Sequence, residues 1–133
     1  MAKASRSKKL RDGFVGGAVF RVQILPRAFN DLDTISAYIK AEGSFTVAER
    51  WLQRIVERIG TLAKNPNRCP IAFANESLQQ PIRLLLSGSR QHAYKIYFSM
   101  SEAHGTVHVV HVRHWARKAP TAAEIKGSVT EPQ

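Results

Sequence analysis

The sequence predicts an α+β domain in which two helices form an αα-hairpin packed on one face of a small, mainly antiparallel sheet. Three observations predict it: the expected elements run in the order β-α-α-β-β-β, each helix carries one apolar stripe, and short turn-like segments separate the last three strands. With 133 residues, 44% of them hydrophobic, the chain can bury a core without covalent staples. Its single cysteine, Cys69, excludes an intramolecular disulfide and gives no argument for secretion.

The first strand and the first helix are expected at residues 19–25 and about 26–41. Apolar and polar residues alternate through the strand, which predicts one apolar face. Pro26 ends the strand and suits the first turn of a helix, where its missing N–H would have no partner anyway. The helix has an apolar stripe at helical spacing, formed by Ala28, Leu32, Ile35 and Ile39.

The second helix has the clearest local signals. Thr46 and Glu49 have the spacing of a capping box, in which each side chain satisfies a backbone N–H of the first turn. Apolar residues then recur at three- and four-residue steps as far as Leu62, and Asn65 and Pro66 are expected to end the helix. Because only a few residues separate the two helices, they should lie antiparallel. The face opposite the apolar stripe carries Arg50, Arg54 and Arg58.

Residues 65–80 are expected to form a polar loop, and three strands should follow at 82–86, 92–100 and 106–113. The segments between them are short enough for hairpins, so the strands should form an antiparallel meander. In the middle strand every second residue is apolar, and the alternating residues Tyr94, Ile96, Phe98 and Met100 should face one way. Lys95 and Tyr97 should face the other way, on a side of the sheet that the helices leave open and cationic.

The expected organisation is a flexible basic arm at residues 1–18, one folded domain at 19–118 and a polar C-terminal tail at 119–133. The tail is expected to be loose, with at most a helical turn near 122–126. The N-terminus is not interpreted as a signal peptide, because its apolar run contains Gly16 and Gly17 and shows no clear cleavage motif. No stretch approaches the roughly 20 apolar residues of a membrane helix. These features predict a cytoplasmic protein without a membrane partner.

Charge is the strongest bulk signal in the composition. Twenty Lys and Arg residues against ten Asp and Glu residues give a formal net charge of +10, and the pI is near 10.4. Such a field attracts polyanions and acidic proteins, although a merely solvated basic surface is the alternative. The arginines of the second helix could likewise bind an acidic partner or form a merely solvated helix face.

An ordered set of five motifs resembles the RelE/ParE family of bacterial type II toxins. The motifs are Pro-x-Ala-x-x-Asp-Leu-x-x-Ile-x-x-Tyr-Ile at 26–39, Leu-x-x-x-Pro at 62–66, Ile-Arg-x-Leu at 82–85, Tyr-x-Ile-x-Phe at 94–98, and His-x-x-Arg at His114 and Arg117. The set spans residues 20–118. The resemblance implies a toxin that uses no cofactor and forms a hetero-oligomer with a cognate acidic antitoxin.

Two activities occur in this family, so the fold alone does not choose between them. ParE-like members inhibit DNA gyrase and have no known nuclease chemistry, whereas RelE-like members are ribosome-dependent mRNA endonucleases that need no metal. RelE-like members carry a C-terminal tyrosine where this chain has Ala123, and their lysine-rich loop is missing because residues 69–80 contain no lysine. The resemblance therefore favours a non-enzymatic gyrase inhibitor. The alternatives are a RelE-like endoribonuclease and an inactive module that binds nucleic acid or an antitoxin.

The candidate site residues follow from these two activities. Cleavage of RNA without a metal needs groups that activate the 2′-OH, stabilise the phosphate and protonate the leaving oxygen, and the candidates are Arg83, Lys95, His111 and Arg117. This set requires Arg83 to share one open sheet face with Lys95 and Tyr97. Arg83 and Arg117 could instead support the fold.

Residues expected to bind the target or the antitoxin are Arg50, Arg54, Arg58, Arg83, Tyr97, His114, Trp115 and Arg117. No metal site is expected. The three-residue steps between His108, His111 and His114 would place successive histidines on opposite faces of a strand.

Overall fold

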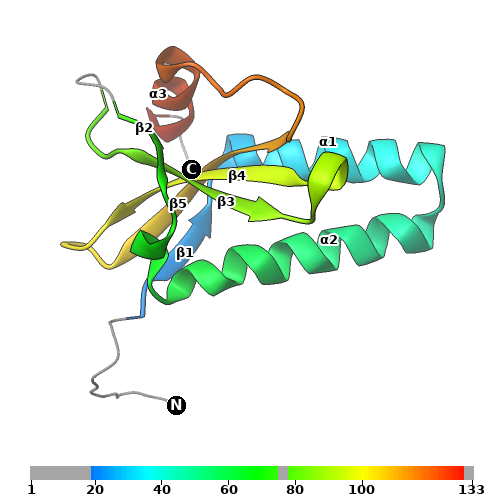
Figure 1. Ribbon diagram of the computed structural model, residues 1–133, viewed down its shortest axis with the longest axis horizontal. Helices are drawn as coiled ribbons and strands as arrows, with labels where there is room; N and C mark the ends of the chain where they lie inside the picture. Colours follow the sequence, from blue (N-terminus) through cyan, green and yellow to red (C-terminus); the bar gives the residue numbers. More distant parts are fainter. Residues whose placement is uncertain (1–18, 75–77, 131–133) are drawn as a thin grey trace.

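The computed structural model describes residues 19–74 and 78–130, which form two helices on a sheet and a third helix on its far side (Figure 1). The basic arm expected at residues 1–18 lies outside the described residues. The helices and strands in chain order are β1 (Arg21–Ile24), α1 (Pro26–Glu42), α2 (Phe45–Gly60), β2 (Ile71–Phe73), β3 (Ile82–Ser87), β4 (Tyr94–Ser101), β5 (Thr106–His114) and α3 (Ala122–Thr130). Short 3₁₀ turns lie at Thr61–Ala63, Pro66–Arg68 and Arg90–His92.

The sheet has five strands in the order β1-β5-β4-β3-β2. The strand β1 pairs parallel with β5, and the other neighbours pair antiparallel. The expected α+β class, the αα-hairpin and the mainly antiparallel sheet are therefore confirmed. The strand β2 was missed, because three residues at a sheet edge are too few to show a period of two.

The αα-hairpin forms where the sequence predicts it, but the start of α2 differs in detail. The α1 helix begins at Pro26, directly after the buried Leu25. The N-cap of α2 is Ser44, whose hydroxyl accepts the N–H of Val47 at 3.1 Å. The capping box expected at Thr46 is therefore wrong. Ser44 has the extended conformation that an N-cap needs, whereas Thr46 already lies inside the first turn of the helix.

The main core lies between the αα-hairpin and the sheet. Leu32 comes from α1, Ile55 and Ile59 from α2, and Phe98 and Val109 from the central strands, and all five are buried. Each fully buried side chain of this size contributes roughly 1.5–3 kcal/mol to stability. This core fixes the position of the hairpin on the sheet.

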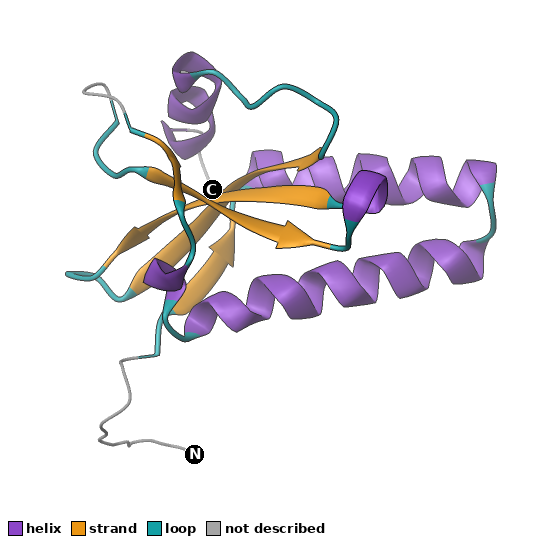
Figure 2. Cartoon of the chain, viewed as in Figure 1, coloured by secondary structure: helices purple, strands orange, loops and turns teal. Residues whose placement is uncertain are grey.

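A second, smaller core lies on the other face of the sheet, beneath α3 (Figure 2). Ile125 of α3 is 1% exposed and packs with Ile82, Tyr97 and Val110. The helical turn expected near 122–126 is present and extends to Thr130 as α3, so this part of the tail is not loose. The sheet face that was expected to be open is partly covered by it.

The α3 helix has a reciprocal capping box that explains why it forms. Thr121 Oγ accepts the N–H of Glu124 at 3.2 Å, and Glu124 Oε1 accepts the N–H of Thr121 at 2.9 Å. Together with the apolar anchor Ile125, this cap turns a mostly polar segment into a docked helix. None of the helices in the described part of the chain is long and apolar enough to cross a membrane.

Candidate partner-binding surface

A groove of about 550 Å³ lies between the αα-hairpin and the β3–β4 connection. We call it the hairpin groove, and its lining residues are Ile39, Val47, Trp51, Arg54, Ser87, Gly88, Ser89, His92, Tyr94 and His114. Gly88 shapes its rim, since it has φ +89° and a Cβ there would lie 3.1 Å from the carbonyl oxygen of His92. Only glycine adopts that conformation at low cost.

Three rings in edge-to-face contact form one wall of the hairpin groove. Trp51 meets Tyr94 edge to face with ring centroids 5.2 Å apart, and Tyr94 meets His114 in the same way at 5.3 Å. Burial, and next the nearby Tyr38, raise the pKa of the Tyr94 phenol, so it stays protonated. The two edge-to-face contacts join the three rings into one aromatic surface of the groove.

Exposed apolar side chains line this groove or lie close in sequence to its lining residues. Phe45 and Val47, in the first turn of α2, are 61% and 49% exposed. Trp115, which follows the lining residue His114 in sequence, is 46% exposed. The tip of the hairpin also projects past the ends of β3 and β4 (Figure 1). A concentration of exposed large apolar residues is typical of a protein–protein interface.

The three arginines predicted on α2 have different environments. Arg54 lines the hairpin groove and gives it a positive charge. Arg58 donates from Nε to the carbonyl of Leu86 at 2.9 Å, so it caps the edge of β3. Arg50 is exposed and does not line the groove. Among the described residues that line the groove, none is acidic, so the groove suits an acidic partner.

Arg83 does not share a sheet face with Lys95 and Tyr97, so that expectation is wrong. It pairs with Phe98 of the main core, while its neighbour Leu84 pairs with Tyr97 on the α3 side. The reason is the β3–β4 connection, which occupies residues 88–93 and sets a register that the sequence pattern alone does not fix. The guanidinium donates to the carbonyls of Cys69 at 2.6 Å and Asn67 at 3.3 Å.

We expect Arg83→Met to lower the free energy of unfolding by about 1–2 kcal/mol, since two hydrogen bonds from a partly buried charged group are lost. Chemical denaturation measures the change. The matched control is Arg50→Met, an exposed site on α2 that should change stability by less than about 0.5 kcal/mol. Equal effects of the two substitutions would show that Arg83 has no structural role.

Tyr97 and His111 are buried, which removes both from the set of residues that could touch a partner directly. Tyr97 is 2% exposed and His111 is fully buried, and the two pair across β4 and β5. Burial, and next the charge of Arg27, lower the pKa of His111, while Asp31 at 3.9 Å opposes them. Burial also raises the pKa of Tyr97. Both groups are therefore neutral at neutral pH.

Lys95 and Arg117 meet through the backbone rather than in a cluster with Arg83. Lys95 Nζ donates to the carbonyl of Arg117 at 2.7 Å, and Lys95 pairs with Arg113 on the α3 side. The side chain of Arg117 is exposed. The four nuclease candidates therefore do not form one cluster: Arg83 lies on the hairpin side, His111 is buried, and Lys95 contacts only the backbone of Arg117.

Arg113 is a structural residue that the sequence analysis missed. It is 5% exposed and donates to the carbonyl of Lys118 at 3.0 Å and to Glu124 Oε2 at 2.9 Å. An arginine within a valine-rich strand was the signal that could have identified it. Arg113 and Glu124 hold α3 to β5, because a buried guanidinium needs an anionic partner.

The attachment of α3 should depend on pH through Glu124. The N–H of Thr121 and, after it, Arg113 lower the pKa of this carboxyl from 4.5 to about 2. A carboxyl whose pKa is lowered by folding stabilises the fold above its unfolded pKa, and the stabilisation is lost as the pH falls through the folded pKa. Melting temperatures of wild type and Glu124→Gln should therefore differ at pH 7 and converge between pH 4.5 and about 2. A difference that stays constant over this range would contradict the assignment.

The fold is similar to that of two solved structures. The chain resembles the chromosomal ParDE TA system from P. aeruginosa, with a TM-score of 0.57 and 17% identity over 72% of this chain and 96% of that chain. It also resembles the toxin-antitoxin complex RelBE2 from Mycobacterium tuberculosis, with a TM-score of 0.51 and 21% identity over 75% of this chain and 95% of that chain. At these identities the likeness shows a shared fold.

Comparison of the sequence with protein families identifies the family of the chain. Residues 22–119 match the family described as the ParE toxin of the type II toxin-antitoxin system, parDE. The chain therefore belongs to the ParE toxin family of type II toxin-antitoxin systems. No curated protein matched the sequence.

Proposed function

We propose that this toxin acts in the cytoplasm by binding and inhibiting DNA gyrase, without chemistry of its own. The main support is that the residues considered for RNA cleavage do not lie together in one cluster. General acid–base cleavage of RNA needs groups within hydrogen-bond reach of one scissile phosphate. Instead, Arg83 supports the loop at Cys69 on the hairpin side, and His111 is buried against β4 and α3. Membership of the ParE family supports the same target class.

We further propose that a cognate acidic antitoxin neutralises the toxin by docking in the hairpin groove. The groove combines an aromatic wall, exposed apolar neighbours and the charge of Arg54. An acidic amphipathic helix or extended segment has the complementary chemistry, and such a segment commonly folds as it binds. Arg50, Trp115 and Arg117, which are exposed, are available to widen that contact or to meet the target.

A supercoiling assay with purified gyrase tests the proposed target. The toxin should inhibit supercoiling at micromolar concentration, and equimolar antitoxin should restore it. Unimpaired supercoiling would overturn the proposal. In that case cleavage of ribosome-bound transcripts would indicate the RelE-like activity, and harmless expression without the antitoxin would indicate an inactive binding module.

A further inference from the structure

A buried histidine lies between the two helices that meet β5 from opposite faces of the sheet. All five histidines belong to the described residues, and His111 alone among them is fully buried. Its Nδ1 lies 3.9 Å from Asp31 Oδ2 in α1, and its ring hydrogen-bonds to the backbone of Glu124 in α3. His111 is outside the hairpin groove, so the proposed antitoxin site does not use it.

The surroundings of His111 make a positive charge on its ring costly. Charged or titratable residues face the ring from every element around it: Arg27 and Asp31 of α1, Tyr97 of β4, Arg113 of β5 and Glu124 of α3. Burial lowers the pKa of His111 most, the charge of Arg27 is the next cause, and Arg113 acts in the same direction. Asp31 and the backbone of Glu124 oppose them without reversing the result. A proton would therefore leave an incompletely balanced charge in a buried site.

Of the two helices that cover His111, α3 is the more weakly held. The α1 helix has 17 residues and packs into the main core. The α3 helix has nine residues, and it is held to the sheet by Ile125 and by the ion pair of Arg113 with Glu124. Local opening occurs where few buried apolar contacts hold an element. We therefore expect α3, rather than α1, to open when His111 is exposed to water.

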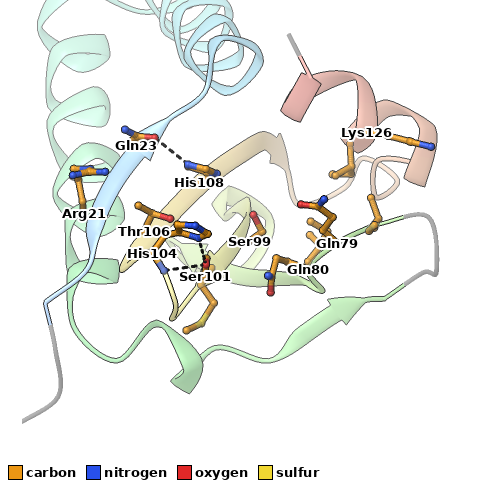
Figure 3. Close-up of a pocket in the computed structure, with 14 residues that line it drawn as sticks. Arg21, Gln23, Gln79, Gln80, Ser99, Ser101, His104, Thr106, His108 and Lys126 are labelled. Atoms are coloured by element: carbon orange, nitrogen blue, oxygen red, sulfur yellow. Dashed lines mark hydrogen bonds between the residues drawn. The ribbon is translucent and has the colours of Figure 1, made fainter. Parts of the chain in front are cut away.

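Open space beside α3 allows the helix to separate from the sheet. A cavity of about 710 Å³ lies next to α3 on the same sheet face (Figure 3). Ile125 and Lys126 of the helix belong to its lining, and Gln23 and His108 line the side formed by β1 and β5 (Figure 3). This flank of α3 thus faces a cavity rather than a packed element. The helix can separate from β5 while the strands stay paired.

We propose that His111 makes the docking of α3 sensitive to acid, so that protonation of its ring releases α3 and exposes the sheet face beneath the helix. The ring takes up the proton when α3 is open, and redocking would bury that charge near Arg27 and Arg113. The main core is on the other face of the sheet, so the αα-hairpin keeps its position. This inference does not depend on gyrase being the target or on where the antitoxin docks.

The pH range of the release follows from the two states of His111. With α3 open the imidazole has its ordinary pKa of 6.5, and with α3 docked its pKa is lower. Docking is therefore most stable above pH 6.5, and opening becomes up to about tenfold more favourable for each pH unit below it until the pKa of the docked state is reached. The carboxyl of Glu124 titrates in a separate range, below pH 4.5.

Hydrogen exchange of the full-length chain, followed by NMR between about pH 7 and pH 5, tests the proposal. Protection factors, which correct for the intrinsic effect of pH on exchange, should fall about tenfold or more for the α3 amides and stay constant for the β4 amides. The amide of Ile125, which donates to the carbonyl of Thr121, is one such probe. His111→Gln has no titrating ring and should abolish the fall. His108→Gln is the matched control, the same substitution at a half-buried histidine of β5, and should retain it.

Arg27→Gln keeps the proposal testable if His111→Gln does not fold. Arg27 is partly exposed, and removing its charge raises the pKa of the docked His111, so the fall should be smaller than in wild type. Arg50→Gln, on the exposed face of α2, should leave the fall unchanged. The proposal is overturned if the α3 protection factors do not change with pH, or if either His111→Gln or Arg27→Gln shows the wild-type fall. Loss of protection in β4 together with α3 would also overturn it, because the opening would then be global.

Discussion

Val47→Asp is expected to weaken antitoxin binding by roughly 30-fold or more, the size of an interface hot spot. Val47 lines the hairpin groove beside Trp51 and Tyr94, and it is 49% exposed, so the free toxin tolerates a polar residue there. An aspartate would be desolvated against apolar groups on binding and would repel an acidic partner. Titration of the purified antitoxin into each variant measures the loss.

Val56→Asp provides the matched control for this prediction. Val56 lies on the same helix and is 44% exposed, but it does not line the groove. The two variants carry the same substitution and the same net charge, so a difference between them reports the groove itself. If both bind the antitoxin as tightly as wild type, the antitoxin docks elsewhere.

Ile125→Ala is expected to lower the free energy of unfolding by about 2–4 kcal/mol, because it leaves a cavity in the second core. Ile125 is 1% exposed and provides the apolar contact of α3 with Tyr97 and Val110. Denaturation monitored by circular dichroism measures the loss. The measured loss would be smaller if α3 undocks without unfolding the sheet. Hydrogen exchange at β5 then distinguishes local from global opening.

Ala123→Ser is the control on the same helix, since Ala123 is exposed and should tolerate serine within about 0.5 kcal/mol. Should Ile125→Ala match this control, α3 would contribute nothing to the fold. The face beneath it would then be the open surface that the sequence analysis expected.

The sequence contained enough to predict the architecture, because the two helices repeat their apolar residues over many turns. Leu32 and Ile55 fall on stripes long enough that the helical period is unambiguous, and both are buried in the main core. Tyr94, Ile96 and Phe98 alternate correctly, and they do face the hairpin. The residue pattern predicted the buried face correctly in these elements, because each of them supplies several residues to one face.

The candidate site was harder to predict, because it depends on register and on one docked helix. The pairing of Arg83 with Phe98 follows from the geometry of the β3–β4 connection, which no periodicity reveals. In β5 the register shifts, so Val109 pairs with Phe98 and His111 with Tyr97, leaving Val110 as an extra residue. Tyr97 is buried in the second core partly by Ile125, which comes from a segment too short to show a clear apolar period.

We propose that this toxin acts by binding rather than by cutting RNA. Mapping of transcript ends in bacteria after induction of the toxin, with the antitoxin absent, tests it most directly. We predict growth arrest with intact transcripts, and transcripts that are equally intact with Arg117→Ala. Cleavage of coding regions by the wild type, abolished in Arg117→Ala at equal protein level, would contradict the account.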